Sequence, residues 1–184
     1  MGLRVAGGTA RGVPLAAVKD KGVRPTSERT RSALFSILAA YGLEGCTVLD
    51  LYAGTGALGI EALSRGATWA DFVEKSTNQC RIIRQNLKAA NLDERAQVVC
   101  SPVKRALGRL QGPYRFILAD PPYESEEIEA LMTRLSEASW LEPGGLVVLE
   151  HSVRKQPREA FALLNLMQTR RYGDSCLSLY GREA

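Results

Sequence analysis

The sequence has 184 residues, of which 45% are hydrophobic, so it is long enough to bury one full core and short for two domains. No apolar run approaches the roughly 20 residues that span a bilayer, and residues 1–12 lead into a glycine-rich segment rather than a signal sequence. Four scattered cysteines without C-x-x-C spacing and a single histidine argue against a metal site. We therefore expect one cytoplasmic, monomeric domain without metal or membrane contact.

The charge is distributed unevenly along the chain. The net charge is +4, but residues 1–45 carry +4 and residues 151–184 carry +3, whereas residues 46–150 carry −3. Basic ends around an acidic centre are suited to a polyanionic substrate held outside a pocket that accepts a cationic ligand. An ordinary solvated surface is the alternative, because +4 is a modest charge.

The N-terminal segment predicts a basic hairpin followed by a helix. Short apolar runs in residues 2–18 flank a glycine-rich turn, which favours a hairpin. The segment Pro25-Thr26-Ser27-Glu28 predicts a helix start, with Thr26 or Ser27 as the N-cap and an apolar stripe ending at Tyr41. Five basic side chains in these segments are candidate phosphate contacts for a nucleic-acid substrate: Arg4, Arg11, Arg24, Arg29 and Arg31. For Arg29 and Arg31, pairing with local carboxylates is an equal alternative.

From residue 46 onward, predicted strands alternate with helices. Strands are expected near 46–52, 69–74, 96–100, 115–120 and 145–150, and the chain ends in strands near 164–172 and 176–180. This alternation predicts an α/β fold with a mostly parallel, seven-stranded sheet and helices on both faces. In such sheets, ligands bind at the carboxyl ends of the strands, where Asp50, Glu74 and Asp120 are all expected.

The first strand runs into a glycine-rich loop, where Gly54, Gly56 and Gly59 match G-x-G-x-x-G. This pattern alone is weak, because many nucleotide-binding folds share it. Asp50 at the strand end would repel a pyrophosphate and attract a cationic sulfonium, so the loop favours S-adenosylmethionine over a dinucleotide. Glu74 ends the next strand 20 residues after Gly54, where an acid meets ribose hydroxyls in this architecture.

The fourth strand delivers Asp120-Pro121-Pro122-Tyr123 to its carboxyl end. Proline has no backbone N–H, so the carbonyls of Asp120 and Pro121 can face a ligand, and Tyr123 offers a ring for stacking. This chemistry suits a flat exocyclic amino group. A strand that simply ends at a turn beside a surface tyrosine is the alternative reading.

Taken together, these motifs resemble one family along nearly the whole chain. Ala6-Gly7-Gly8 with Arg11-Gly12, the Arg24-Pro25-Thr26 segment, the glycine loop and the Asp-Pro-Pro-Tyr motif are similar to the RsmD family of bacterial rRNA methyltransferases. The resemblance implies a Rossmann-like class I S-adenosylmethionine-dependent fold over residues 1–184, with a basic hairpin extension at 1–22 and a catalytic core at 23–184. It also implies methylation of guanine N2 at position 966 of 16S rRNA, on small ribosomal subunits that are already assembled.

The resemblance assigns site residues position by position. Asp120, Pro121, Pro122 and Tyr123 are the expected catalytic residues. The adenine site is less regular, because Pro102 stands where related families place an Asp or Asn, so Ser101 or the Val103 N–H is expected to contact adenine. The full set of expected cofactor contacts is Asp50, Tyr52, Ala53, Gly54, Gly56, Glu74, Lys75, Ser101, Val103 and Asp120.

Other functions use parts of the same pattern. A DNA adenine-N6 methyltransferase would share the loop and the tetrapeptide, but no insertion here is large enough for reading a DNA sequence. A protein glutamine methyltransferase more often has Asn-Pro-Pro-Tyr, and a noncatalytic RNA-binding module would leave the three strand-end acids without a purpose. His151 is expected to form a polar cap on the sheet, with the pocket as the alternative position.

Overall fold

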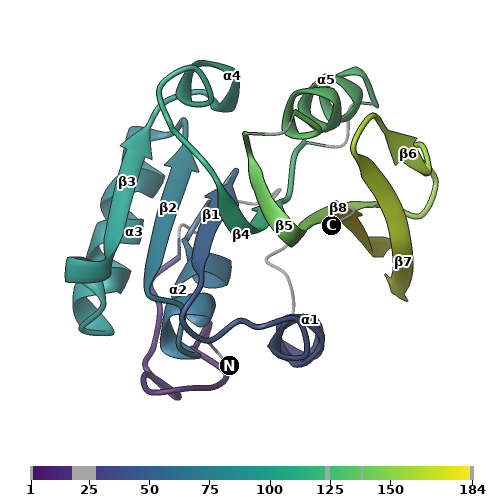
Figure 1. The fold of residues 1–184 in the computed structure, drawn as a ribbon. Helices are drawn as coiled ribbons and strands as arrows, with labels where there is room; N and C mark the ends of the chain where they lie inside the picture. The colour runs from purple at the N-terminus through teal and green to yellow at the C-terminus, as the bar shows by residue number, and fades with distance from the viewer. Residues whose placement is uncertain (1, 18–27, 123–124, 138, 183–184) are drawn as a thin grey trace.

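The computed structural model describes residues 2–17, 28–122, 125–137 and 139–182. Its centre is a twisted sheet with the strand order β3-β2-β1-β4-β5-β8-β7-β6 (Figure 1). The expected seven strands are present, and the eighth is the two-residue β6. The strands are β1 Thr47–Leu51, β2 Trp69–Glu74, β3 Ala96–Cys100, β4 Tyr114–Ala119, β5 Leu141–Ser152, β6 Ala160–Phe161, β7 Leu164–Tyr172 and β8 Ser175–Arg182.

The first five strands in chain order are parallel, and the last pairs are antiparallel. β1 pairs with β2 and β4, β2 with β3, and β4 with β5, all in parallel. β8 then pairs antiparallel with both β5 and β7. Because parallel strands share a direction, the carboxyl ends of β1, β2 and β4 meet at one edge of the sheet, as the sequence predicts.

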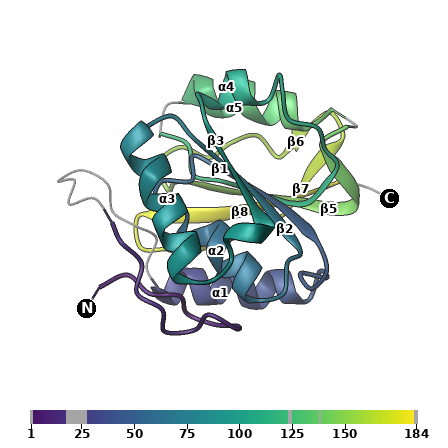
Figure 2. The same ribbon diagram turned by 90° about the vertical axis from the view of Figure 1, so that its left-hand side faces the viewer.

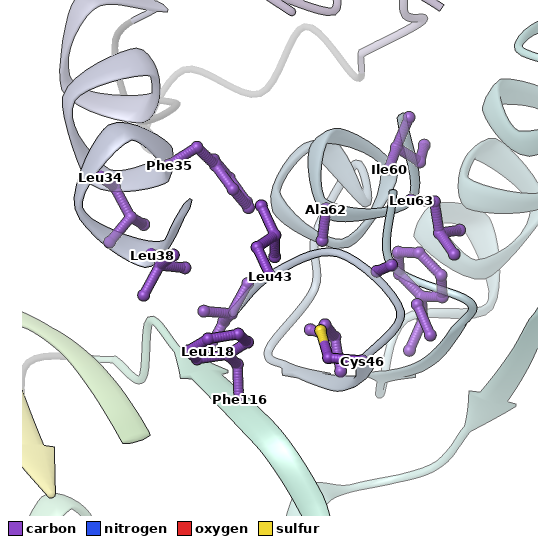
Figure 3. Close-up of a cluster of buried hydrophobic side chains, with 14 of the residues drawn as sticks. Leu34, Phe35, Leu38, Leu43, Cys46, Ile60, Ala62, Leu63, Phe116 and Leu118 are labelled. Carbon is purple, nitrogen blue, oxygen red and sulfur yellow. The ribbon is translucent and has the colours of Figure 1, made fainter. Parts of the chain in front are cut away.

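Helices cover both faces of the sheet (Figure 2). The apolar strands β1 and β4 alternate their side chains between two separate cores, as period-two geometry requires. One core lies beneath α1, α2 and α3 and contains Phe35, Leu63 and Phe116 (Figure 3), and the other lies beneath α4 and α5. The helices are α1 Glu28–Ala39, α2 Ala57–Ser64, α3 Thr77–Ala89, α4 Val103–Ala106 and α5 Ser125–Leu135, with a short 3₁₀ helix at Asp93–Arg95.

The N-terminal segment 2–17 is an arm that doubles back on itself beside α2, as expected for a hairpin. Val5 donates its N–H to Val13 at 3.0 Å, and Leu15 donates to Leu3 at 2.8 Å. The arm is not a free extension, however, because Val5, Ala10 and Leu15 are buried in the core beneath α1–α3. Its contribution to the fold is therefore partly hydrophobic.

Polar bonds fasten the arm to two helices. Ala6 N–H donates to Glu61 Oε2 at 2.8 Å, and Ala10 N–H donates to Ser64 Oγ at 2.9 Å, both in α2. Farther along, Ala16 N–H donates to Asn86 Oδ1 in α3 at 2.7 Å. The tip of the arm thus lies at the C-terminal end of α2, and its base lies against α3.

Candidate active site at the carboxyl ends of the strands

The loop after β1 contains left-handed backbone conformations that its glycines allow. Gly54 and Gly56 have φ angles of 55° and 77°, in the left-handed region that glycine adopts without steric cost. A Cβ on Gly56 would also lie 3.0 Å from Ile83 Cγ2. Tyr52 shares the left-handed conformation with φ 58°, which is uncommon for a side chain of its size. The loop is therefore a well-defined turn that presents backbone groups at the edge of the sheet.

Asp50 joins this loop to the start of α2. Its Oδ2 accepts the Gly59 N–H at 2.8 Å, and Gly59 is required there because a Cβ would lie 2.3 Å from Phe72 Cε1. Asp50 is 2% exposed. Burial raises the pKa of Asp50 to about 8, against the opposing effect of the Gly59 bond and with further raising by Asp120 and Glu74.

Glu74 holds the loop from the end of β2. Its Oε2 accepts the Gly54 N–H at 3.0 Å, and its Oε1 accepts the Ser76 N–H at 2.8 Å. The Glu74 carbonyl accepts the N–H of Ser101, so the expected adenine-site residue lies beside the expected ribose acid. Each carboxylate oxygen keeps a lone pair for a hydroxyl donor. Lys75 is exposed next to this position, and Val103 is buried at the start of α4.

Asp120 lies directly beyond β4, beside Glu150 on β5. The parallel register pairs Ala119 with Leu149, so the two acids are the next residues on neighbouring strands. Burial, together with the negative charge of Glu150, raises the pKa of Asp120 to about 7. Glu150 is itself buried and lines a small cavity with Leu34 of α1. Asp120 can therefore hold or release a proton near neutral pH.

A hydrogen bond from Tyr52 to α5 connects the glycine loop to the helix that follows Asp120. Tyr52 O–H donates to Glu127 Oε1 of α5 at 3.0 Å, and burial together with this bond raises the pKa of the phenol. This contact joins the end of β1 to the helix that follows the Asp-Pro-Pro segment. Pro121 is buried and Pro122 is exposed, whereas the predicted stacking residue Tyr123 lies outside the described residues.

The acidic side chains at the strand ends suit a positively charged ligand. Four acids, Asp50, Glu74, Asp120 and Glu150, end neighbouring strands, and mutual repulsion contributes to the raised pKa values of two of them. Among the described residues, the hydrogen bonds of Asp50 and Glu74 come from backbone N–H groups and not from a basic side chain. A positively charged sulfur near these acids would relieve their repulsion. These four acids therefore suit S-adenosylmethionine better than a pyrophosphate.

The predicted RNA-binding arginines do not form one surface. Arg4, Arg11 and Arg29 are exposed, with Arg4 Nη1 donating to the Gly12 carbonyl at 2.9 Å, and Arg24 lies outside the described residues. Arg31 is 1% exposed, and this part of the prediction is wrong. Its Nε lies 3.3 Å from Glu61 Oε2 and its Nη2 donates to the Arg4 carbonyl, so it fastens α1 to α2 and the arm.

The sequence analysis did not assign two residues that lie near the site. Glu150 shows the same signal as Asp50 and Asp120, an acid that ends an apolar run, but the sequence analysis gave it no role in the site. Asn86 in α3 is buried, with 1% of its surface exposed. Its amide nitrogen donates to Ala16 O at 3.0 Å and to Thr55 O in the glycine loop at 2.9 Å. A short polar residue among the apolar positions of a helix was the available signal.

His151 does form a polar contact inside the sheet. It is fully buried, and its Nε2 lies 2.8 Å from Ser178 Oγ, which in turn lies 2.8 Å from Thr169 Oγ1. Within the described residues, no cluster of three His, Cys, Asp or Glu side chains could hold a metal ion. Within the same residues, no helix combines the length and the apolar character needed to cross a membrane.

Comparisons with known proteins place the chain in one family. The family model described as conserved hypothetical protein 95 matches residues 3–181. The chain is 34% identical to YlbH of Bacillus subtilis, a candidate rRNA methyltransferase, over 97% of this chain and 98% of the relative. It is 33% identical to ribosomal RNA small subunit methyltransferase D of Escherichia coli, over 99% of this chain and 91% of the relative. The solved structure of Escherichia coli yhhF, a candidate methyltransferase, matches with a TM-score of 0.85 and 32% identity, covering 99% and 98% of the two chains.

Proposed function

The chain belongs to the RsmD family, the conserved hypothetical protein 95 family, and we propose that it methylates N2 of a guanine in small-subunit ribosomal RNA. The observation that carries the proposal is the pair of acids at neighbouring strand ends, Asp120 with Glu150, beside a glycine loop whose acids suit a sulfonium. The 33% identical relative named as a small-subunit rRNA methyltransferase supports rRNA as the substrate class. Guanine N2 at position 966 is the finer proposal, taken from the family resemblance.

The glycine loop and its acids would hold the cofactor. S-adenosylmethionine supplies a methyl group on a positively charged sulfur. Asp50 and the loop from Tyr52 to Gly56 would face its methionine part, and Glu74 with Lys75 would bind the ribose. Ser101 and the Val103 N–H would meet the adenine. Because Glu74 already fixes the Gly54 N–H, the loop is shaped before any ligand binds.

Asp120 and the Pro121 carbonyl would accept the two hydrogens of the guanine amine. The amine lone pair is delocalised into the ring, so two acceptors that fix its hydrogens favour a tetrahedral nitrogen and stabilise the positive charge that develops on it. Asp120 can then hold the departing proton on its carboxyl oxygen, because a pKa of about 7 leaves much of it ionised at neutral pH. Tyr123 and Pro122 would pack against the extruded base.

The test is methyl transfer measured on three substrates in parallel. Labelled S-adenosylmethionine is incubated with unmodified small ribosomal subunits, naked ribosomal RNA and duplex DNA, and the product nucleosides are identified. N2-methylguanosine from a ribosomal substrate supports the proposal, and mapping by primer extension tests position 966. N6-methyladenine in DNA would instead support the DNA methyltransferase alternative.

Replacing Asp120 tests the proposed mechanism. Asp120→Ala should lower turnover by at least ~100-fold, the range for one lost electrostatic contact to the transition state. Affinity for S-adenosylhomocysteine, measured by calorimetry, should change far less. Glu126→Gln on the exposed side of α5 is the control with the same loss of one negative charge. Near-normal turnover of Asp120→Ala would contradict the role.

A further inference from the structure

The C-terminal strand pair brings basic side chains to the edge of the sheet that holds the acids. β8 runs antiparallel to β5 and β7 runs antiparallel to β8, so β7 runs in the direction of β5. The last residues of β7 therefore lie at the same edge as the end of β5. The Val153 N–H, directly after β5, donates to the Asp174 carbonyl in the β7–β8 turn at 3.0 Å. The turn is thus fastened beside the end of β5.

One row of the sheet connects this turn to the proposed catalytic residue. Glu150 pairs with Leu177 on β8, and Leu177 pairs with Arg170 on β7, whereas Asp120 lies beside Glu150. Three strand spacings of ~4.8 Å place the Arg170 backbone about 14 Å from that of Asp120. This distance corresponds to about four stacked nucleotides at 3.4 Å per step. It is the range of the phosphates that flank a target base.

Arg170 also lies on the same face of the sheet as Glu150. Directly paired residues share a face, and Leu177 lies in the core beneath α1–α3, lining a cavity with Glu150. Tyr172, two residues after Arg170, packs against the same core and is partly exposed. Arg171 lies on the opposite face, where its Nε donates to the Gly173 carbonyl at 2.9 Å.

Two further basic side chains follow the end of β5. Arg154 and Lys155 are exposed, and the Arg154 N–H donates to Ser152 Oγ, which holds this segment close to the strand end. Asp174 is the acid in the same region, so the local charge stays positive. The arm offers a contrast, because its tip is bonded to Ser64 at the far end of α2. In Figure 1 the arm and β7 lie on opposite sides of the molecule.

We propose that Arg154, Lys155, Arg170 and Tyr172, here called the hairpin surface, bind the single-stranded RNA that flanks the target guanine. This inference rests on the proposed function. The arginines and the lysine contact phosphates, and the partly exposed Tyr172 is a platform for a neighbouring base. The hairpin surface is therefore the part of the basic C-terminal segment that positions RNA relative to Asp120.

The experiment compares two double variants with equal loss of charge. Arg154→Ala with Arg170→Ala removes two charges from the hairpin surface, and Arg81→Ala with Lys88→Ala removes two from the exposed side of α3. KM and kcat for unmodified small ribosomal subunits are measured between 50 and 200 mM KCl at constant magnesium. Affinity for S-adenosylhomocysteine and the melting temperature are measured for each protein.

The hairpin variant should raise the KM for subunits at least ~5-fold and reduce the slope against log salt by about 1.4, or ~0.7 for each lost phosphate contact to a single strand. The α3 variant should behave like wild type, and Arg154→Lys with Arg170→Lys should restore the KM. Equal KM values and slopes for the two alanine variants would overturn the hairpin surface while leaving the proposed function intact. Failure of the wild-type protein to methylate rRNA would overturn both.

Discussion

Raising the pH should destabilise the unliganded protein, because the site buries carboxyl groups that resist ionisation. The pKa of Asp50 is about 8 in the folded protein against an ordinary value of 3.8. Between these values the unfolded chain has lost the proton that the folded protein keeps, so stability is present below pH 4 and is lost as the pH rises through 8. The limit is about 1.4 kcal/mol per pH unit for one such group. Over the three pH units from 5 to 8 this limit amounts to about 4 kcal/mol, which is the most that Asp50 can remove.

Urea unfolding of wild type and of Asp50→Asn at pH 5, 6, 7 and 8 measures this contribution. The neutral amide cannot ionise, so the variant should lose clearly less of its free energy of unfolding over this range. Asp93→Asn, at an exposed position in the 3₁₀ helix, is the control and should follow the wild type. The reasoning about buried acids would be refuted if Asp50→Asn lost stability with pH as steeply as wild type did.

Two further predictions concern residues that fasten the arm and the loop. Arg31→Ala should lower the free energy of unfolding by about 3 kcal/mol, because it removes one of the two arginines that pair with buried Glu61, Arg65 being the other, together with the bond to the Arg4 carbonyl. Arg29→Ala should change it by less than ~0.5 kcal/mol; equal effects in urea titrations would contradict the burial of Arg31. Asn86→Ala should weaken S-adenosylhomocysteine binding at least ~5-fold in calorimetry, because a lost hydrogen bond of ~1 kcal/mol loosens the glycine loop. Its exposed neighbour Gln85→Ala should leave that affinity unchanged, and a matching loss in both variants would argue against a role of Asn86 in the loop.

The positions of the strands and the edge that carries the site could be predicted because their signals are local. Apolar runs that end in an acid mark Asp50, Glu74 and Asp120, and the structure brings all three to one edge. The glycine loop was predictable for the same reason, because the left-handed backbone at these two positions favours glycine, and Gly54 and Gly56 can be read directly from the sequence.

The placement of charged side chains could not be predicted in this way. Arg31 and Arg29 are two positions apart on α1, and sequence alone does not say which of them faces Glu61 across a helix contact. The basic side chain Arg170 reaches the site edge only because two antiparallel pairings return β7 to the direction of β5. Such long-range placement depends on the register of the whole sheet rather than on a motif.

The arm also affects the order in which the chain can fold. The side chains that hold residues 2–17 are Glu61, Ser64 and Asn86, and they follow their partners in the arm by 54 to 70 positions in the chain. Contacts between distant residues form late, because the loop between them must close first. The arm is therefore synthesised before α2 and α3, and its apolar residues stay exposed until these helices have formed the surface that receives it.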